Sequence, residues 1–159
     1  MNHDAEPRRI QLRRAQAVGT PAIVVGIDGS ATSWDAFAWA AGEAVRTNGH
    51  LVAVYVMPYI EPTAAFAVPY AYGVAAASRQ DLADEIEADA VRRAGEADVP
   101  INFISEYGEP IGTLADVARA VNAHLVVVGR SAKPWHRLTG SLGHRLTCRK
   151  DAPVVVVVP

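Results

Sequence analysis

Two places in the chain combine glycine with polar side chains directly after an apolar run, in a way that suits phosphate binding. The first is Asp28-Gly29-Ser30, and the second begins at Gly129-Arg130 and continues toward Gly140-Ser141. Glycine lets the backbone approach a phosphate closely. A Gly-Ser pair that opens a helix offers free N–H groups and the positive end of the helix dipole to an anion. These positions are the candidate ligand-binding residues.

Two features of these loops allow more than one interpretation. Arg130, Lys133, His136 and Arg137 concentrate positive charge after the second run, where they could contact a phosphate or form a solvated basic loop. Asp28 could face a ligand at a strand end or could form a turn by bonding its own backbone. The sequence leaves both alternatives open.

Other kinds of site have weaker support. Ser141, His144 and Asp28 have the residue types of a nucleophile, a base and an orienting acid, but the sequence lacks the Gly-x-Ser-x-Gly elbow of many serine hydrolases. His and Cys spacings predict no metal site. The acidic run from Asp81 to Asp89 is interpreted as the solvated face of a helix. We therefore expect a protein that is not an enzyme.

The elements that would position these loops alternate along the chain. Apolar, β-branched runs predict five strands, and apolar residues at helical spacing between them predict helices. The strands are expected at Ala22–Ile27, Leu51–Met57, Ile101–Ser105, His124–Val128 and Val154–Val158. Such alternation is typical of a single doubly wound α/β domain of the Rossmann-like kind, whose ligand crevice lies at the carboxyl ends of the strands.

The first helix is expected to have Thr32 or Ser33 as its N-cap, a buried face that includes Phe37, Ala38 and Val45, and a stop at Asn48-Gly49. A second helix is expected to begin near Ser78. A third is expected from Pro110, and a fourth over Gly140–Arg149.

Length and composition fit one cytoplasmic domain. The 159 residues, half of them apolar, can bury a single core, which we place in residues 20–159 after a mobile arm formed by residues 1–19. The stretch Pro58–Gly73 is irregular, which is typical of a lid, a partner-contacting loop or a mobile excursion. A net charge of −2 gives no support for nucleic acid as a partner, and no run approaches the roughly 18 apolar residues of a membrane span. The single cysteine, Cys148, fits a reducing compartment.

Four separated segments together resemble the universal stress protein family. They are Val24–Ser30, Leu125–Arg130, Gly140–Leu142 and Pro153–Val158, in the family's order. The resemblance implies a five-stranded parallel sheet of order 3-2-1-4-5 with helices on both faces. It also implies that the cofactor is ATP or another adenine nucleotide, with Mg²⁺ as a possible companion of the nucleotide, and that any ATPase activity is weak and incidental.

The resemblance assigns a part of the nucleotide to each matching position. Gly26 and Asp28 would line the ribose, and the backbone of Val56 would contact adenine. Val128 and Gly129 would form the turn at the triphosphate, and Gly140, Ser141 and Leu142 would close around the phosphates. Arg130 and Ala132 lie in the same loop and are the other candidate nucleotide-binding residues.

The phosphate loop departs from the family's pattern at two points. Ala132 stands where the ATP-binding branch has a second glycine, and seven residues rather than nine precede Gly140. If that position needs a left-handed backbone, alanine costs about 1–2 kcal/mol. Two functions therefore remain open: a non-catalytic nucleotide-binding stress or signalling protein, or a nucleotide-free dimer that acts through protein partners.

The last apolar run predicts how the chain assembles. Val154–Val158 is uncharged, and the family's topology places it at a sheet edge. An unprotected edge of this kind favours pairing with another strand. A homodimer joined through this strand is the expected assembly, with no nucleic acid or membrane as partner.

Overall fold

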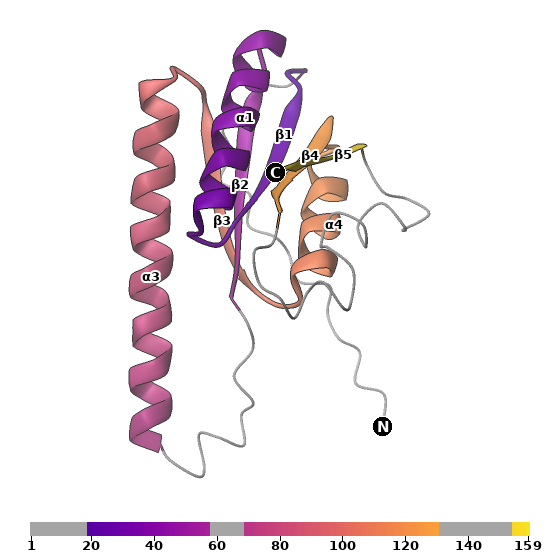
Figure 1. The fold of residues 1–159 in the computed structure, drawn as a ribbon. Coiled ribbons are helices and arrows are strands. Elements are labelled where there is room, and N and C mark those ends of the chain that lie inside the picture. The colour runs from indigo at the N-terminus through magenta and orange to yellow at the C-terminus, as the bar shows by residue number, and fades with distance from the viewer. Residues whose placement is uncertain (1–18, 58–68, 131–153) are drawn as a thin grey trace, which may run out of the picture.

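The architecture is a five-stranded parallel sheet with helices on both faces. The computed structural model describes residues 19–57, 69–130 and 154–159 (Figure 1). All neighbouring strands run parallel, in the order β3-β2-β1-β4-β5. The elements in chain order are β1 Ala22–Ile27, α1 Ala31–Thr47, β2 His50–Met57, α3 Pro69–Glu96, β3 Ile101–Tyr107, α4 Pro110–Ala120, β4 Leu125–Gly129 and β5 Val154–Val158. The expected fold class and strand order are confirmed.

Some of the expectations concern residues that the structure does not describe. The arm at residues 1–19 falls there except for its last residue, and so does most of the Pro58–Gly73 stretch. The expected helix Gly140–Arg149 also lies outside the described residues.

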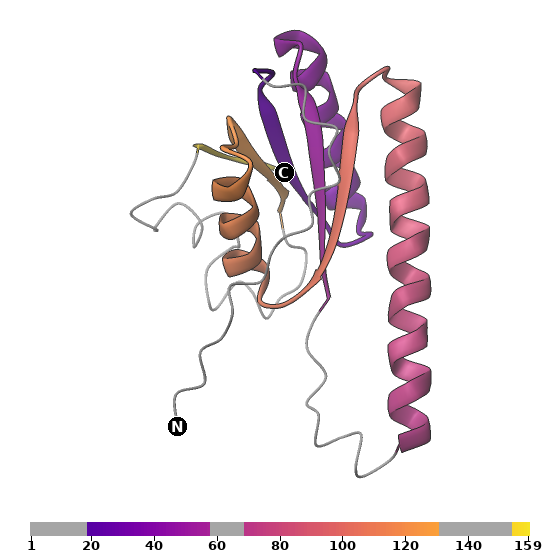
Figure 2. The same cartoon turned by 180° about the vertical axis from the view of Figure 1, so that it is seen from behind.

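Successive side chains of β1 point to opposite faces of the sheet. Ile23, Val25 and Ile27 are buried beneath α1 and α3, whereas Val24 faces α4. Figures 1 and 2 show α1 and α3 on one side of the sheet and α4 on the other. Because strands buried on both faces need apolar side chains at nearly every position, β1 and β4 are unbroken apolar runs, and β2 is one after His50.

The start of α1 differs from the expectation. Its N-cap is Ser30, whose hydroxyl accepts a hydrogen bond from the N–H of Ser33 at 3.2 Å, so the helix begins before Thr32 and Ser33. Of the expected buried face, Phe37 is buried as predicted, but Ala38 and Val45 are exposed. The hydrophobic residues of α1 that are buried are Ala36, Phe37, Ala40, Ala41 and Ala44.

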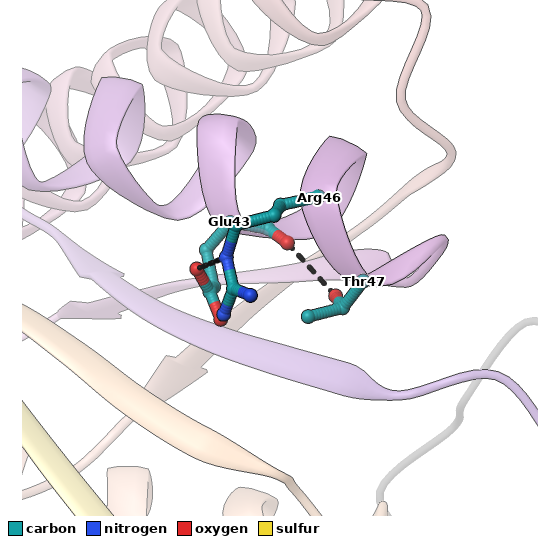
Figure 3. Close-up of polar contacts among 3 residues, drawn as sticks. All are labelled: Glu43, Arg46 and Thr47. Atoms are coloured by element: carbon teal, nitrogen blue, oxygen red, sulfur yellow. Dashed lines mark hydrogen bonds and ion pairs between the residues drawn. The ribbon is translucent and has the colours of Figure 1, made fainter.

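The end of α1 is fixed by local bonds. Asn48 adopts the left-handed conformation (φ 51°) that ends many helices, as the Asn48-Gly49 pair predicted. In the last turn of α1, Arg46 pairs with the carboxylate of Glu43, and the Thr47 hydroxyl donates to the Glu43 carbonyl at 2.8 Å (Figure 3). Donation from Arg46 lowers the pKa of Glu43 below its ordinary value.

The helix α3 is much longer than expected. It spans 28 residues from Pro69, so Ser78 lies inside it and is not its cap. Pro69 suits a first helical position, where its missing N–H costs nothing. The expected apolar face is confirmed, because Ala83, Ile86, Ala90 and Ala94 are all buried. The first turns of α3 extend beyond the carboxyl ends of β2 and β3 (Figures 1 and 2).

The strand β5 lies at one edge of the sheet. It pairs with β4 along its whole length, from Leu125 opposite Val154 to Gly129 opposite Val158. Val154 and Val157 are exposed (68% and 42%), whereas Val156 packs toward the core beneath α1.

Candidate functional site

The carboxyl ends of β1, β2 and β4 lie side by side, but they do not end level. Ile27, the last residue of β1, pairs with Tyr55, and β2 continues for two more residues to Met57. In a doubly wound sheet this is the edge where ligands bind. Because β1 lies between β2 and β4, its early end leaves a step at the middle of that edge.

The backbone of Val56 lies at this step. In a parallel strand, successive residues direct their N–H and C=O groups to opposite neighbours. His50 donates to Pro21 on the β1 side at 2.9 Å, and the Met57 carbonyl accepts from Gly108 on the β3 side at 3.0 Å. Because the backbone groups of β2 alternate in direction, the Val56 carbonyl is directed toward β1. It lies one position beyond Ile27, the last residue of β1. This geometry fits a backbone acceptor for a ligand's amino group.

Asp28 forms the turn between β1 and α1. Its carboxylate accepts hydrogen bonds from the Ser30 N–H at 3.0 Å and the Ser30 hydroxyl at 2.5 Å. The Asp28 N–H faces the Ser33 hydroxyl at 3.4 Å, and Gly29 between them has a φ of 80° that favours glycine. Asp28 itself is exposed at the carboxyl edge of the sheet. The structure thus shows the turn-forming interpretation, and a ligand contact stays a prediction.

Gly26 and Val128 are placed by packing on the α4 face. They pair across β1 and β4, and a β-carbon on Gly26 would lie 3.2 Å from Leu114 Cδ1. Val128 is buried in the same cluster as Leu114. The absence of a side chain at Gly26 allows α4 to approach β1 closely, which explains this glycine without a ligand.

Gly129 and Arg130 lie where β4 ends. A β-carbon on Gly129 would come within 2.3 Å of the Thr32 carbonyl oxygen and 2.9 Å of the Ser33 nitrogen. The Arg130 N–H donates to Val158 at 2.8 Å, while its side chain is exposed. Hence the backbone of Gly129 and Arg130 lies between the first turn of α1 and the end of β5.

The rest of the expected phosphate loop is not described. Ala132, Gly140, Ser141 and Leu142 lie outside the described residues, as do the basic side chains of Lys133, His136 and Arg137. The structure therefore brings the ends of β1, β2 and β4 together and leaves the loop's part in the site as a prediction.

Sequence reasoning missed three side chains near this edge. The pKa of Tyr55 is raised, mainly by burial, while Arg79 opposes this shift and Asp28 and Tyr107 add to it. Tyr55 therefore lies within electrostatic reach of a residue from α3, of the turn after β1 and of the end of β3. Extending the spacing of Ala83, Ile86 and Ala90 back by one turn would have predicted that Arg79 faces the sheet.

Two further searches cover only the described part of the chain. There, no group of three or more His, Cys, Asp or Glu side chains could hold a metal ion. Over the same residues, no helix is both long and apolar enough to cross a membrane.

Comparison with known proteins identifies the family. The model of the universal stress protein family matches residues 20–158. The curated relatives include universal stress protein Rv2005c of Mycobacterium tuberculosis (strain ATCC 25618 / H37Rv), which is 32% identical over 152 residues covering 85% of this chain and 47% of the relative. Universal stress protein Mb2028c of Mycobacterium bovis (strain ATCC BAA-935 / AF2122/97) matches to the same extent. The chain thus spans about half the length of these curated relatives.

Solved structures agree in fold. A universal stress protein crystallised in complex with cAMP is 25% identical, with a TM-score of 0.68 over 87% of this chain and 97% of that one. A family member from Burkholderia pseudomallei is 23% identical, with a TM-score of 0.70 over 87% and 95%. One from Archaeoglobus fulgidus in complex with dAMP is 17% identical, with a TM-score of 0.60 over 88% and 98%. On its sequence and its fold alike, this chain belongs to the universal stress protein family.

Proposed function

We propose that this chain is a non-catalytic adenine-nucleotide-binding stress or signalling protein, with the nucleotide held at the carboxyl ends of β1, β2 and β4. The observation that carries the proposal is the step between β1 and β2. There the Val56 carbonyl extends past the end of β1, close to the turn that carries Asp28. A carbonyl acceptor suits the amino group of adenine, and an exposed carboxylate suits a ribose hydroxyl.

The comparisons support the class of ligand. The universal stress protein with cAMP resembles this chain over nearly its whole length and binds an adenine nucleotide. ATP, with or without Mg²⁺, stays the finer prediction, because Ala132 and the shortened loop alter the segment that would wrap a triphosphate. A nucleotide with one phosphate needs fewer contacts from that segment than a triphosphate does. We therefore expect AMP or cAMP to bind at least as tightly as ATP.

The test is calorimetric titration of the purified full chain with ATP, AMP and cAMP. Asp28→Ala and Ser141→Ala should weaken binding, while Asp35→Ala is the matched control, since Asp35 is an exposed carboxylate on α1. Asp28→Ala also removes two hydrogen bonds to Ser30, so its thermal unfolding must be measured alongside. Binding that survives both site variants would place the nucleotide elsewhere.

A second candidate function follows from the altered loop. If no nucleotide binds at millimolar concentration to folded protein, the nucleotide-free, partner-binding function becomes the better proposal. In either case, we propose that the chain forms a homodimer through the outer edge of β5, the last strand of the described sheet, where Val154 and Val157 are exposed. A cytoplasmic location stays a prediction.

A further inference from the structure

Arg79 has an unusual environment for an arginine of a surface helix. Its Nη1 atom is buried, and among the described residues it has no hydrogen-bond partner. A guanidinium nitrogen that has lost water without gaining an acceptor destabilises the fold. A buried donor of this kind needs a physical explanation, and a ligand that accepts its hydrogen bond would provide one.

The position of Arg79 follows from the periodicity of α3. Ala83, Ile86 and Ala90 form the stripe that faces the sheet, and Arg79 lies on the same stripe one turn earlier. The helix packs on β2 and β3. The side chain of Ile86 already reaches the turn after β1, since a β-carbon on Gly29 would lie 3.5 Å from Ile86 Cδ1. Arg79 lies two turns closer to the amino end of α3, so it faces the carboxyl ends of these strands.

The electrostatic neighbours of Tyr55 support this location. Arg79, Asp28 and Tyr107 all act on the Tyr55 hydroxyl, which projects from β2 one residue before Val56. The positive charge of Arg79 is therefore beside the β1–β2 step and on the face covered by α1 and α3.

We propose that Arg79 is a base-contacting residue of the nucleotide site, whose Nη1 donates a hydrogen bond to a ring nitrogen of adenine. This inference rests on the proposed function. It specifies that the base of the nucleotide is the part of the ligand that Arg79 would contact. Adenine carries an amino donor beside ring-nitrogen acceptors. An acceptor at the Val56 carbonyl and a donor at Arg79 match that arrangement.

The strand order argues for the base rather than for the phosphates. The phosphate loop follows β4, and β1 separates β4 from β2. With neighbouring strands about 4.8 Å apart, that loop begins roughly 10 Å from β2 and roughly 14 Å from β3. Arg79 lies over β2 and β3, so it is nearer to the group that Val56 would bind.

Arg93 provides a matched control on the same helix. It also has a buried nitrogen without a hydrogen-bond partner among the described residues, Nε, but its guanidinium lies 4.5 Å from the centre of the Trp34 ring. This cation–π contact gives Arg93 a structural role, away from the step. Arg79 and Arg93 are thus two arginines of one helix with different expected roles.

The experiment compares wild type, Arg79→Met and Arg93→Met by calorimetry with AMP and with adenosine, which lacks the phosphate. Arg79→Met should weaken both ligands equally, by about 10- to 100-fold, which is the effect of losing a hydrogen bond from a charged donor. Arg93→Met should bind both ligands like wild type. Without ligand, Arg79→Met should unfold at the same temperature as wild type or higher, because an unpaired buried group is removed, whereas Arg93→Met should unfold at a lower temperature.

The outcomes separate this inference from the proposed function. If wild type binds neither ligand, the proposed function fails and the role of Arg79 fails with it. If wild type binds and Arg79→Met binds equally well, only the role of Arg79 is wrong. If Arg79→Met weakens AMP and leaves adenosine unchanged, Arg79 contacts the phosphate and the base assignment is overturned. A lower unfolding temperature of ligand-free Arg79→Met with unchanged affinities would make Arg79 structural.

Discussion

The backbone of Thr32 approaches Gly129 so closely that a β-carbon on the glycine would lie 2.3 Å from the Thr32 carbonyl oxygen. The end of β4 and the first turn of α1 therefore touch. Any residue larger than glycine at position 129 must push the start of α1 away from the sheet.

Gly129→Ala should lower the free energy of unfolding by about 3 kcal/mol, because the added methyl group meets backbone that cannot rotate aside. Gly42→Ala is the control. Gly42 is exposed within α1, and no atom of the described residues outside its own helix backbone lies within 4 Å of the place of a β-carbon, so alanine there should stabilise the protein by about 0.5–1 kcal/mol. Denaturant unfolding measures both changes, and a neutral Gly129→Ala would show that α1 can shift freely.

Acid should destabilise the fold through His50. Its Nδ1 lies 3.0 Å from the Thr20 hydroxyl, its Nε2 is buried, and burial lowers its pKa from the ordinary value of 6.5. The unfolded chain therefore takes up this proton first as the pH falls. The contribution of neutral His50 to stability is complete above about pH 6.5 and is lost as the pH falls toward the lowered pKa.

The measurement is the free energy of unfolding of wild type and His50→Gln at about pH 7.5 and about pH 5.5. Wild type should lose more stability than the variant between these two conditions. His124→Gln, which changes an exposed histidine, should behave like wild type. Equal losses in wild type and His50→Gln would contradict the assignment.

The outer edge of β5 offers a test of assembly. Val157→Lys should convert a dimer into a monomer of 16.9 kDa in light scattering, because a charge beside an open strand edge opposes pairing. Val156 is unsuitable for this test, since it packs toward the core and lysine there would disturb the fold. Val45→Lys places the same change on an exposed position of α1 and should leave the mass unchanged. A Val157→Lys protein of dimeric mass would exclude the β5 edge.

The sheet could be predicted from the sequence because its strands are buried on both faces. Runs such as Ala22–Ile27 have almost no polar residue, and β-branched side chains between turn residues define such strands well. The position of α1 was harder to predict. Ser30, Thr32 and Ser33 can all cap a helix, and the choice of Ser30 depends on Asp28 holding the turn.

The start of α3 and its arginine could not be predicted for a related reason. The sequence near Tyr70 and Tyr72 has no apolar periodicity, so the helix was expected to begin only where a capping pattern appeared at Ser78. Whether the Nη1 atom of Arg79 is buried depends on how far α3 overlaps β2 and β3, which is a property of tertiary packing. The roles of Gly26 and Gly129 in close packing likewise depend on neighbours that are distant in sequence.

The overhang of α3 also has a consequence for hydrogen exchange. At 1.5 Å per residue the helix is about 42 Å long, whereas the seven residues of β3 span only about 23 Å. Amides near Ala83 to Ala94 are protected by the core, whereas the first turns extend beyond the described strands and gain no protection from the sheet (Figures 1 and 2). One continuous helix should therefore exchange at two very different rates. A ligand that engages Arg79 would slow exchange at the boundary between the two parts, and so would report its arrival through the backbone.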